Sequence, residues 1–408
     1  MKDNISKLNN CYGCGVCVAV CPVKIIELEE NPDGFYSPVI HGKDKCIGCG
    51  ACLDVCAFNH REVSMSGNGL QTYAVWSKDT DVRYVCSSGG VGLEIGRYLI
   101  ERGYRACGVR YNVDKSRAEH YIAETMDDFV LSIGSKYIPS FSVPGFTRIN
   151  RLAGKYFVAG TPCQIDSFRR YIRRFKIEDR FVLMDFFCHG VPSLLLWRKY
   201  MENVEKIVGP VKSVAWRNKA TGWHDSWAMT IDGYSQAEDN RDLGSSDFSR
   251  VSVRQKSHSY TSRLSQGDLF YKFFLNDLCL SPCCYSSCKY KMLSSAADIR
   301  IGDLWGHVFK KNDEGVSGVI SFTSKGDDIV QRISGKCVVE HLPVGIVTEG
   351  QMKRCPFVPF AHDSTMRQLR GVKSLSRIDR SFQLRMYWLC LIFIRFVERV
   401  FRVLKRII

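Results

Sequence analysis

Eight of the chain's nineteen cysteines lie within the first 56 residues, in two groups that repeat one spacing. Each group has the pattern C-x2-C-x2-C-x3-C. Glycines between the cysteines let the backbone turn tightly, so that three thiolates of a group point at one centre. Thiolates in this number and spacing are typical ligands of [4Fe-4S] clusters. The eight candidate ligands are Cys11, Cys14, Cys17, Cys21, Cys46, Cys49, Cys52 and Cys56.

This arrangement resembles the two-cluster ferredoxins of bacteria, in which the fourth cysteine of each run binds the other cluster. Ala57 departs from that pattern, because a proline usually follows the run. A zinc knuckle and a disulfide framework are the alternatives, but zinc sites use separated cysteine pairs and disulfide frameworks belong to small secreted chains. The resemblance assigns Cys11, Cys14, Cys17 and Cys56 to a first set, and Cys46, Cys49, Cys52 and Cys21 to a second set.

The composition limits the partners that we expect. A chain of 408 residues, of which 45% are hydrophobic, is long enough for two or three domains. The formal net charge of +15 counts each cysteine as neutral, whereas each cluster with its thiolates adds about two negative charges. No nucleic-acid-binding motif is present, so we expect no nucleic acid partner. The sequence shows no secretion signal and thiolate ligands need a reducing compartment, so we expect a cytoplasmic protein.

Two domains are expected before the C-terminal region. Residues 1–66 are predicted to form a small α+β ferredoxin-like domain, with a turn at residues 31–34 between two short strands. Residues 64–69, rich in serine and glycine, are predicted to be the linker that follows it. Alternating strand and helix patterns then predict an α/β domain over residues 67–355, including a strand that begins at Asp298 and turns at Gly302.

Further cysteines lie where an α/β sheet would place a ligand. Cys163 and Cys188 each follow a predicted strand, at 155–160 and 181–187. Cys279, Cys283, Cys284 and Cys288 crowd into one later segment of ten residues. Thiols from these three segments would complete a third cluster, and ordinary buried cysteines are the alternative.

A small-residue loop at residues 87–90 precedes a predicted helix. Free backbone N–H groups and the helix dipole favour an anion at such a position. A plain helix N-cap explains the same residues equally well.

Six motifs make residues 71 to about 335 similar to the coenzyme F420 hydrogenase/dehydrogenase beta subunits, which are iron-sulfur flavoproteins. The motifs are SSGG at 87–90, GSKY at 134–137, GTPCQ at 160–164, FCHGVPS at 187–193, WRNK at 216–219 with GW at 222–223, and CYSSC at 284–288 leading to IGDLWG at 301–306. The resemblance implies a third [4Fe-4S] cluster held by Cys163, Cys188, Cys284 and Cys288.

Two departures from the family pattern concern this segment. Three residues separate Cys284 from Cys288 where two are usual, so Cys283 is an alternative partner for Cys288. Ser281 stands where family members commonly carry an arginine, which puts the usual electron acceptor in doubt.

The resemblance also implies FAD in the α/β domain. The 87–90 loop would hold the diphosphate through backbone N–H groups. Lys136 would place a cation near a phosphate or the flavin ring, with a solvated lysine as the alternative. We expect His189 to satisfy backbone groups rather than to transfer protons. The predicted FAD contacts are Ser87, Ser88, Gly89, Gly90, Ser135, Lys136, Thr161 and Gln164.

The remaining segments are polar or basic. Residues 234–265 are predicted to be a long surface loop, and residues 356–380 a basic linker. Residues 381–408 are predicted to be a basic amphipathic helix, whose apolar stretch at 386–394 is too short to span a bilayer. Such a helix lies on the inner face of a membrane, or docks on the protein body.

These features predict an oxidoreductase that relays electrons between [4Fe-4S] clusters and FAD, for hydride transfer to or from an unidentified substrate. A ferredoxin or another redox protein would exchange electrons with it. Some proteins that it resembles lie in gene sets for cell-surface polysaccharides, which suggests that setting. The alternatives are a non-catalytic electron-transfer subunit and a membrane-associated binding protein with structural clusters.

Overall fold

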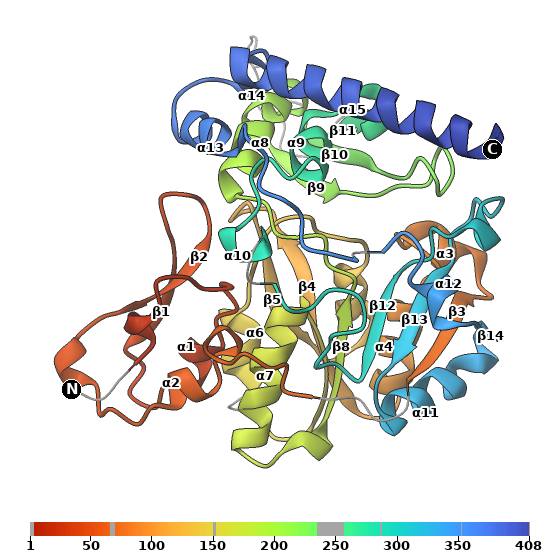
Figure 1. Ribbon diagram of the computed structural model, residues 1–408. Helices are drawn as coiled ribbons and strands as arrows, with labels where there is room; N and C mark the ends of the chain where they lie inside the picture. The colour runs from red at the N-terminus through yellow and green to blue at the C-terminus, as the bar shows by residue number, and fades with distance from the viewer. Residues whose placement is uncertain are drawn as a thin grey trace, which may run out of the picture.

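The computed structural model describes residues 4–65, 70–149, 152–234, 257–285, 288–351 and 353–407. The described residues form a two-stranded, a three-stranded and a nine-stranded sheet. Figure 1 shows the N-terminal domain beside the large sheet, and the last helix lying across the top of the molecule.

The N-terminal domain is small and built around its cysteine loops. Strands β1 (Ile26–Glu30) and β2 (Tyr36–Ile40) are antiparallel, which confirms the predicted turn at 31–34. Helices α1 (Val16–Val20) and α2 (Ala51–Asp54) each begin after a glycine with positive φ, Gly15 and Gly50. These glycines are needed because the chain turns sharply between neighbouring cysteines. Three short 3-10 helices complete the domain: η1 (Ile5–Lys7), η2 (Lys43–Lys45) and η3 (Ala57–Asn59).

The nine-stranded sheet has the order β14-β3-β13-β12-β8-β7-β4-β5-β6. Strands β3, β12, β8, β7 and β4 run in one direction, so their carboxyl ends share one edge. The α/β prediction is confirmed as a mixed sheet. Gly302 does not end β12, because it pairs with Gly318 inside the β12–β13 ladder. The strands are β3 (Gln71–Ser77), β4 (Tyr104–Asn112), β5 (Arg117–Ala123), β6 (Ser140–Phe141), β7 (Lys155–Ala159), β8 (Phe181–Phe186), β12 (Ile299–Asp303), β13 (Ser317–Ser321) and β14 (Cys337–His341).

Helices cover both faces of this sheet, and successive residues of the central strands alternate between them. Phe157 and Val182 pack with α4 (Val91–Ile100) and α11 (Ser324–Arg332). Val158 and Leu183 pack on the other face with α6 (Val143–Ile149) and α7 (Pro162–Arg174). Cys14, Cys17 and Val20 of the N-terminal domain belong to the same buried cluster as α7. The N-terminal domain therefore shares a core with the sheet domain.

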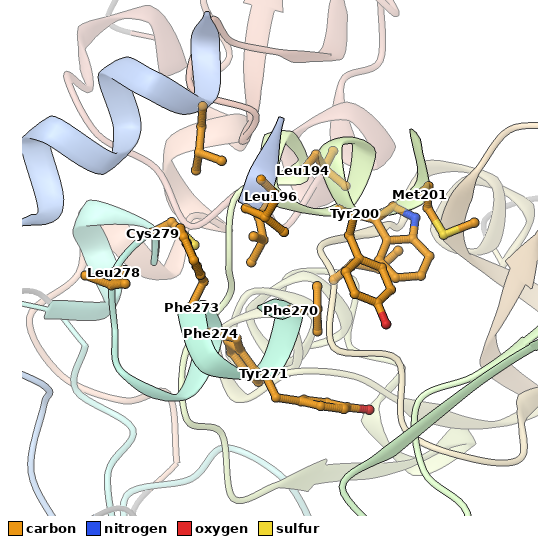
Figure 2. Packing of buried hydrophobic residues seen from close by; sticks show 14 of the residues in the cluster. Leu194, Leu196, Tyr200, Met201, Phe270, Tyr271, Phe273, Phe274, Leu278 and Cys279 are labelled. Atoms are coloured by element: carbon orange, nitrogen blue, oxygen red, sulfur yellow. The ribbon is translucent and has the colours of Figure 1, made fainter. Parts of the chain in front are cut away.

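A second large core lies above the sheet edge. Helices α8 (Leu194–Val208) and α9 (Leu269–Leu275) pack against the sheet of β9 (Val211–Ala215), β10 (Ala228–Tyr234) and β11 (Ser257–Arg263). Figure 2 shows Leu196 and Tyr200 of α8 near the aromatic side chains of α9. The surface loop predicted at 234–265 is wrong at its end, because β11 pairs with β10 along its whole length. Residues 235–256 of that prediction lie outside the described residues.

The C-terminal region is more regular than its sequence suggests. The predicted basic linker at 356–380 is wrong, since it contains α13 (His362–Arg370) and α14 (Leu375–Asp379). Met366, Leu369, Leu375 and Ile378 are buried in the second core, and this burial stabilises both helices. The predicted final helix is confirmed as α15 (Phe382–Ile407). The linker prediction at 64–69 mostly lies outside the described residues, since only Ser64 and Met65 are described.

Short elements join the main ones. The α-helices are α3 (Thr80–Val85), α5 (Met126–Phe129), α10 (Pro282–Tyr285) and α12 (Val344–Val347). The 3-10 helices are η4 (Val130–Ser132), η5 (Glu178–Arg180), η6 (Leu264–Gln266), η7 (His307–Phe309) and η8 (Ile333–Gly335). Of these, α3 and α10 lie next to candidate site residues.

Candidate functional site

The first cysteine set, Cys11, Cys14, Cys17 and Cys56, is buried between α1 and α7. The Cys14 Sγ lies 3.2 Å from the Ser167 hydroxyl of α7, and that hydroxyl also accepts a hydrogen bond from the Ala57 N–H. Burial raises the pKa of the Cys17 thiol, and the neighbouring thiols raise it further. Thiols in such a place need the charge of a metal to ionise, so the set fits a cluster.

The second set lines one hollow at the end of the N-terminal domain. Cys21 reaches it from the first cysteine run, and Cys46, Cys49 and Cys52 reach it from the second. The Asn4 amide contacts the Cys46 Sγ at 3.7 Å. The structure thus brings together the four residues that the crossed assignment predicts.

The spacing of the sulfur atoms favours a group larger than a single metal ion. A tetrahedral zinc ion with bonds of about 2.3 Å would hold its sulfur ligands about 3.8 Å apart. Among the described cysteines, no three Sγ atoms lie within 4.8 Å of one another. The number and spacing of these thiols fit iron-sulfur clusters, whereas zinc sites use separated cysteine pairs.

The third set comes from three distant segments. Cys163 lies in the first turn of α7, Cys188 follows β8, and Cys284 and Cys288 lie in and after α10. Burial raises the pKa of Cys163, and the nearby thiols of Cys188, Cys14 and Cys284 raise it further. Burial also raises the pKa of Cys284, with added contributions from Cys188 and Cys288. The four predicted ligands therefore lie near one another, partly buried, beside the first set.

Two further cysteines border these sets. Cys283, the alternative ligand, donates from its Sγ to the Cys11 carbonyl at 3.3 Å. Cys188 contributes to the raised pKa of Cys284 but is not among the groups that shift the pKa of Cys283. Cys284 is therefore the closer neighbour of Cys188. Cys355 donates to the Cys288 carbonyl at 3.2 Å. No local motif marks Cys355, because its neighbour lies 67 residues away in sequence.

A polar and aromatic network lies between the first and third sets. Burial raises the pKa of Tyr12, and the charges of Cys163 and Cys288 add to this, so Tyr12 faces the third set. Its ring lies 5.8 Å from that of Tyr290, whose hydroxyl donates to Asp166 at 2.7 Å. These residues carry no sequence motif, and only the fold brings them to the cysteines.

The predicted flavin loop lies at the carboxyl edge of the sheet. The Ser135 N–H donates to the Ser87 hydroxyl at 2.9 Å, so two of the predicted FAD segments are in contact. The Gly89 N–H donates to the Ser317 hydroxyl at 3.1 Å. A Cβ at Gly89 would lie 2.5 Å from the Val75 carbonyl oxygen, so only glycine fits there. Gly90, with φ of 83°, begins α4, and Ser88 donates to the Val316 carbonyl.

Three predicted flavin contacts have partners within the chain. The Lys136 ammonium donates to the carbonyls of Ser132 and Ile133 at 2.9 and 2.8 Å, and burial lowers its pKa to about 7. Gln164 accepts from the Thr161 N–H and caps α7. The Thr161 hydroxyl lies 3.2 Å from the Cys163 Sγ, which places both residues beside the third set.

His189 differs from its expected role. Its Nε2 lies 2.7 Å from the Asp277 carboxylate, not beside a backbone group. The reason is that α9 ends next to the segment after β8, and so brings Asp277 to the histidine.

Two buried basic residues lie beside the flavin loop and were not among the FAD contacts predicted from the sequence. Arg217 lies 3.0 Å from the Asp303 carboxylate and donates to the Ser87 carbonyl at 3.3 Å. Burial opposes its charge, but Asp303 keeps the pKa of Arg217 above its usual value. Lys219 donates to the Ser88 carbonyl at 2.6 Å. Both belong to the WRNK motif, which was the available signal. Arg217 is paired with Asp303, and the Lys219 ammonium also bonds the carbonyls of Arg83 and Glu314, so both side chains fix the shape of the loop.

Comparisons with known proteins agree with this site. Residues 153–344 match the family described as the C terminus of the beta subunit of coenzyme F420 hydrogenase/dehydrogenase. Residues 10–60 match the family described as 4Fe-4S dicluster domain. No curated protein matches the chain.

One solved structure with a similar chain is the F420-reducing [NiFe] hydrogenase complex from Methanosarcina barkeri. The identity is 18%, the match covers 68% of this chain and 84% of that chain, and the TM-score is 0.42. The resemblance drawn from the sequence is confirmed by the two family matches. Two regions of the chain are thus similar to known families: residues 10–60 to a 4Fe-4S dicluster domain, and residues 153–344 to the C terminus of the beta subunit of coenzyme F420 hydrogenase/dehydrogenase.

Proposed function

We propose that the protein is an iron-sulfur flavoprotein oxidoreductase, in which residues 1–66 and 67–355 exchange electrons with each other. The observation that carries this proposal is the position of the third cysteine set. Cys14 of the first set is near enough to Cys163 to raise its pKa, and Cys163 lies in the first turn of the helix that follows β7 at the sheet edge. Candidate centres thus continue from the N-terminal domain to the sheet edge at which the 87–90 loop also lies.

Iron-sulfur clusters exchange single electrons, whereas FAD exchanges one or two, so their combination links one-electron donors to hydride chemistry. The residues of the chain provide the fixed positions that this requires. The shared core of α1 and α7 contains Cys14, Cys17 and Cys56 of the first set, and Cys163 of the third set lies in the first turn of the same helix α7. Tyr12 and Tyr290 are in ring contact, and the Tyr290 hydroxyl donates a hydrogen bond to Asp166, so the three side chains are fixed relative to one another.

The flavin part of the proposal rests on the loop at 87–90. Arg217 and Lys219 supply buried positive charge behind it, and Ser135 fixes the Ser87 hydroxyl. The indole rings of Trp223 and Trp305 are stacked, with their centroids 4.6 Å apart. The Trp223 indole also donates a hydrogen bond to Asp303, which places both rings near this loop. Such a site suits a diphosphate next to an aromatic ring system. The substrate that would exchange hydride with it is left open.

An anaerobic stopped-flow experiment tests the proposal. The reconstituted protein is mixed with reduced ferredoxin, and flavin bleaching is followed with and without Cys188→Ala. We expect the variant to slow flavin reduction by about tenfold or more, since it removes a ligand of the third centre. Cys337→Ala, at a buried cysteine outside the three sets, is the matched control and should leave the rate unchanged. Equal rates in all three proteins would contradict the proposed order of centres.

A further inference from the structure

The outer face of α15 is apolar along its length. Six side chains on this face repeat at intervals of four and three residues and are between 41% and 74% exposed. They are Phe382, Met386, Leu389, Phe393, Phe396 and Val400. Exposed aromatic side chains in such a row are unusual in a water-soluble surface, so this face is expected to have a covering.

The opposite face of α15 holds the helix to the body. Leu384 and Tyr387 are buried in the second core, and Trp388 packs at its border. The Trp388 indole donates to Asp379 at 2.9 Å, and the Tyr387 hydroxyl donates to the Asn276 carbonyl at 3.1 Å. Figure 1 shows α15 as the uppermost element, with the rest of the molecule beneath it. The apolar row therefore faces away from the protein.

The apolar row continues onto the segment before α13. Phe357, Val358 and Phe360 are all more than half exposed. The Phe360 ring lies 5.4 Å from the ring of Tyr387, a residue that anchors α15 to the body, so this exposed segment packs at the border of the helix. Together they form one surface, which we call the C-terminal apolar face.

The charges around this face are almost all positive. Arg385 and Arg395 of α15 are exposed, as are Arg367, Arg377 and Arg380 in the helices before it. Glu398 is the acidic residue of α15. A surface with this charge attracts an anionic partner.

The width of the apolar face distinguishes a lipid surface from a second copy of the helix. Ile392 and Ile394 are also exposed, which widens the arc of exposed apolar residues to about 200° at about 100° per residue, with Gln383 and Arg385 as the polar residues at its N-terminal end. A coiled-coil seam is narrower and is flanked by charged residues of both signs. Two copies of this helix would also bring like charges together.

We propose that α15 docks the protein on an anionic lipid surface, with the C-terminal apolar face inserted in the interface. None of the helices in the described part of the chain is long and apolar enough to cross a membrane, so the helix lies in the plane of the bilayer. The Arg395 guanidinium donates a hydrogen bond to the Asn276 side chain at 3.4 Å, so this arginine lies at the border between α15 and the protein body. Interfacial helices carry charged residues at this border of the apolar face. This inference does not depend on the proposed redox function.

Vesicle flotation of the full anaerobic protein tests the inference. We expect binding to vesicles of phosphatidylcholine with phosphatidylglycerol, and binding weaker by about tenfold or more to phosphatidylcholine alone. Leu389→Glu combined with Phe393→Glu should abolish binding to both, because the charged side chains resist insertion. Arg385→Gln combined with Arg395→Gln should weaken only the anionic component.

Ile207→Glu is the matched control, because Ile207 is 59% exposed on α8 and lies outside the C-terminal apolar face. It should float with the anionic vesicles as the unaltered protein does. Failure of the unaltered protein to float would overturn the inference. A dimer in sedimentation equilibrium that Leu389→Glu with Phe393→Glu dissolves, together with no flotation, would assign the face to a second copy instead.

Discussion

Single residues outside the cysteine runs shape the candidate cluster sites. The Ser167 hydroxyl accepts from the Ala57 N–H and from the Cys14 thiol, so once Cys14 is a thiolate the hydroxyl hydrogen can be donated to its sulfur. Hydrogen bonds to the sulfur ligands stabilise the reduced, more negative cluster and raise its potential. A residue of α7 thus tunes a site that sequence alone assigns wholly to the N-terminal domain.

Replacing Ser167 tests this contact. We expect Ser167→Ala to lower the midpoint potential of one cluster by about 40 mV, which corresponds to a hydrogen bond of about 1 kcal/mol for one electron. Redox titration followed by EPR measures the shift. Ser142→Ala is the matched control, since Ser142 is also buried beside Cys14 but donates to its carbonyl at 2.7 Å. Similar shifts in both variants would show that the contact with sulfur is not the cause.

The two cysteine sets of the N-terminal domain could be predicted from the sequence, because their ligands lie close together along the chain. The first run alone places three thiols within seven residues. By contrast, the contacts of Ser167 with Cys14 and of Arg217 with Ser87 join residues more than 100 positions apart. No local pattern encodes such pairs, so they were found only in the structure.

At the scale of elements, two predictions from the sequence were wrong for the same reason: the surface loop at 234–265 and the basic linker at 356–380. Strand β11 reads Ser-His-Ser-Tyr-Thr-Ser-Arg and lies at a sheet edge, so it lacks the apolar alternation that marks a buried strand. Helices α13 and α14 are short and rich in arginine, and each buries only a few apolar residues. Tertiary packing rather than local pattern stabilises these elements.

The loop between α3 and α4 gives an element-scale prediction. Gly89→Ala would place a Cβ against β3 and β13, and displacing the loop should cost about 1–3 kcal/mol. We expect the ratio of flavin to protein to fall while the iron content stays the same. The matched control is Gly335→Ala, where nothing lies within 4 Å of the added Cβ. Retention of flavin by the Gly89 variant would move the flavin site away from this loop.

At the scale of the whole molecule, the candidate centres and the C-terminal apolar face lie in separate places. The N-terminal domain projects to one side, whereas α15 lies along the top (Figure 1). Cys49 of the second set is exposed, which leaves an entry point for electrons from a redox partner. A protein docked through α15 would therefore keep this entry point open to the solvent.

Quantitation of iron, sulfide and flavin on the anaerobically purified protein tests whether it holds three clusters and a flavin. We expect about twelve irons, about twelve sulfides and about one FAD per chain, for three [4Fe-4S] clusters and a flavin. About eight irons with flavin would reduce Cys163, Cys188, Cys284 and Cys288 to structural thiols. About eight irons and no flavin, even after reconstitution, would contradict the oxidoreductase proposal.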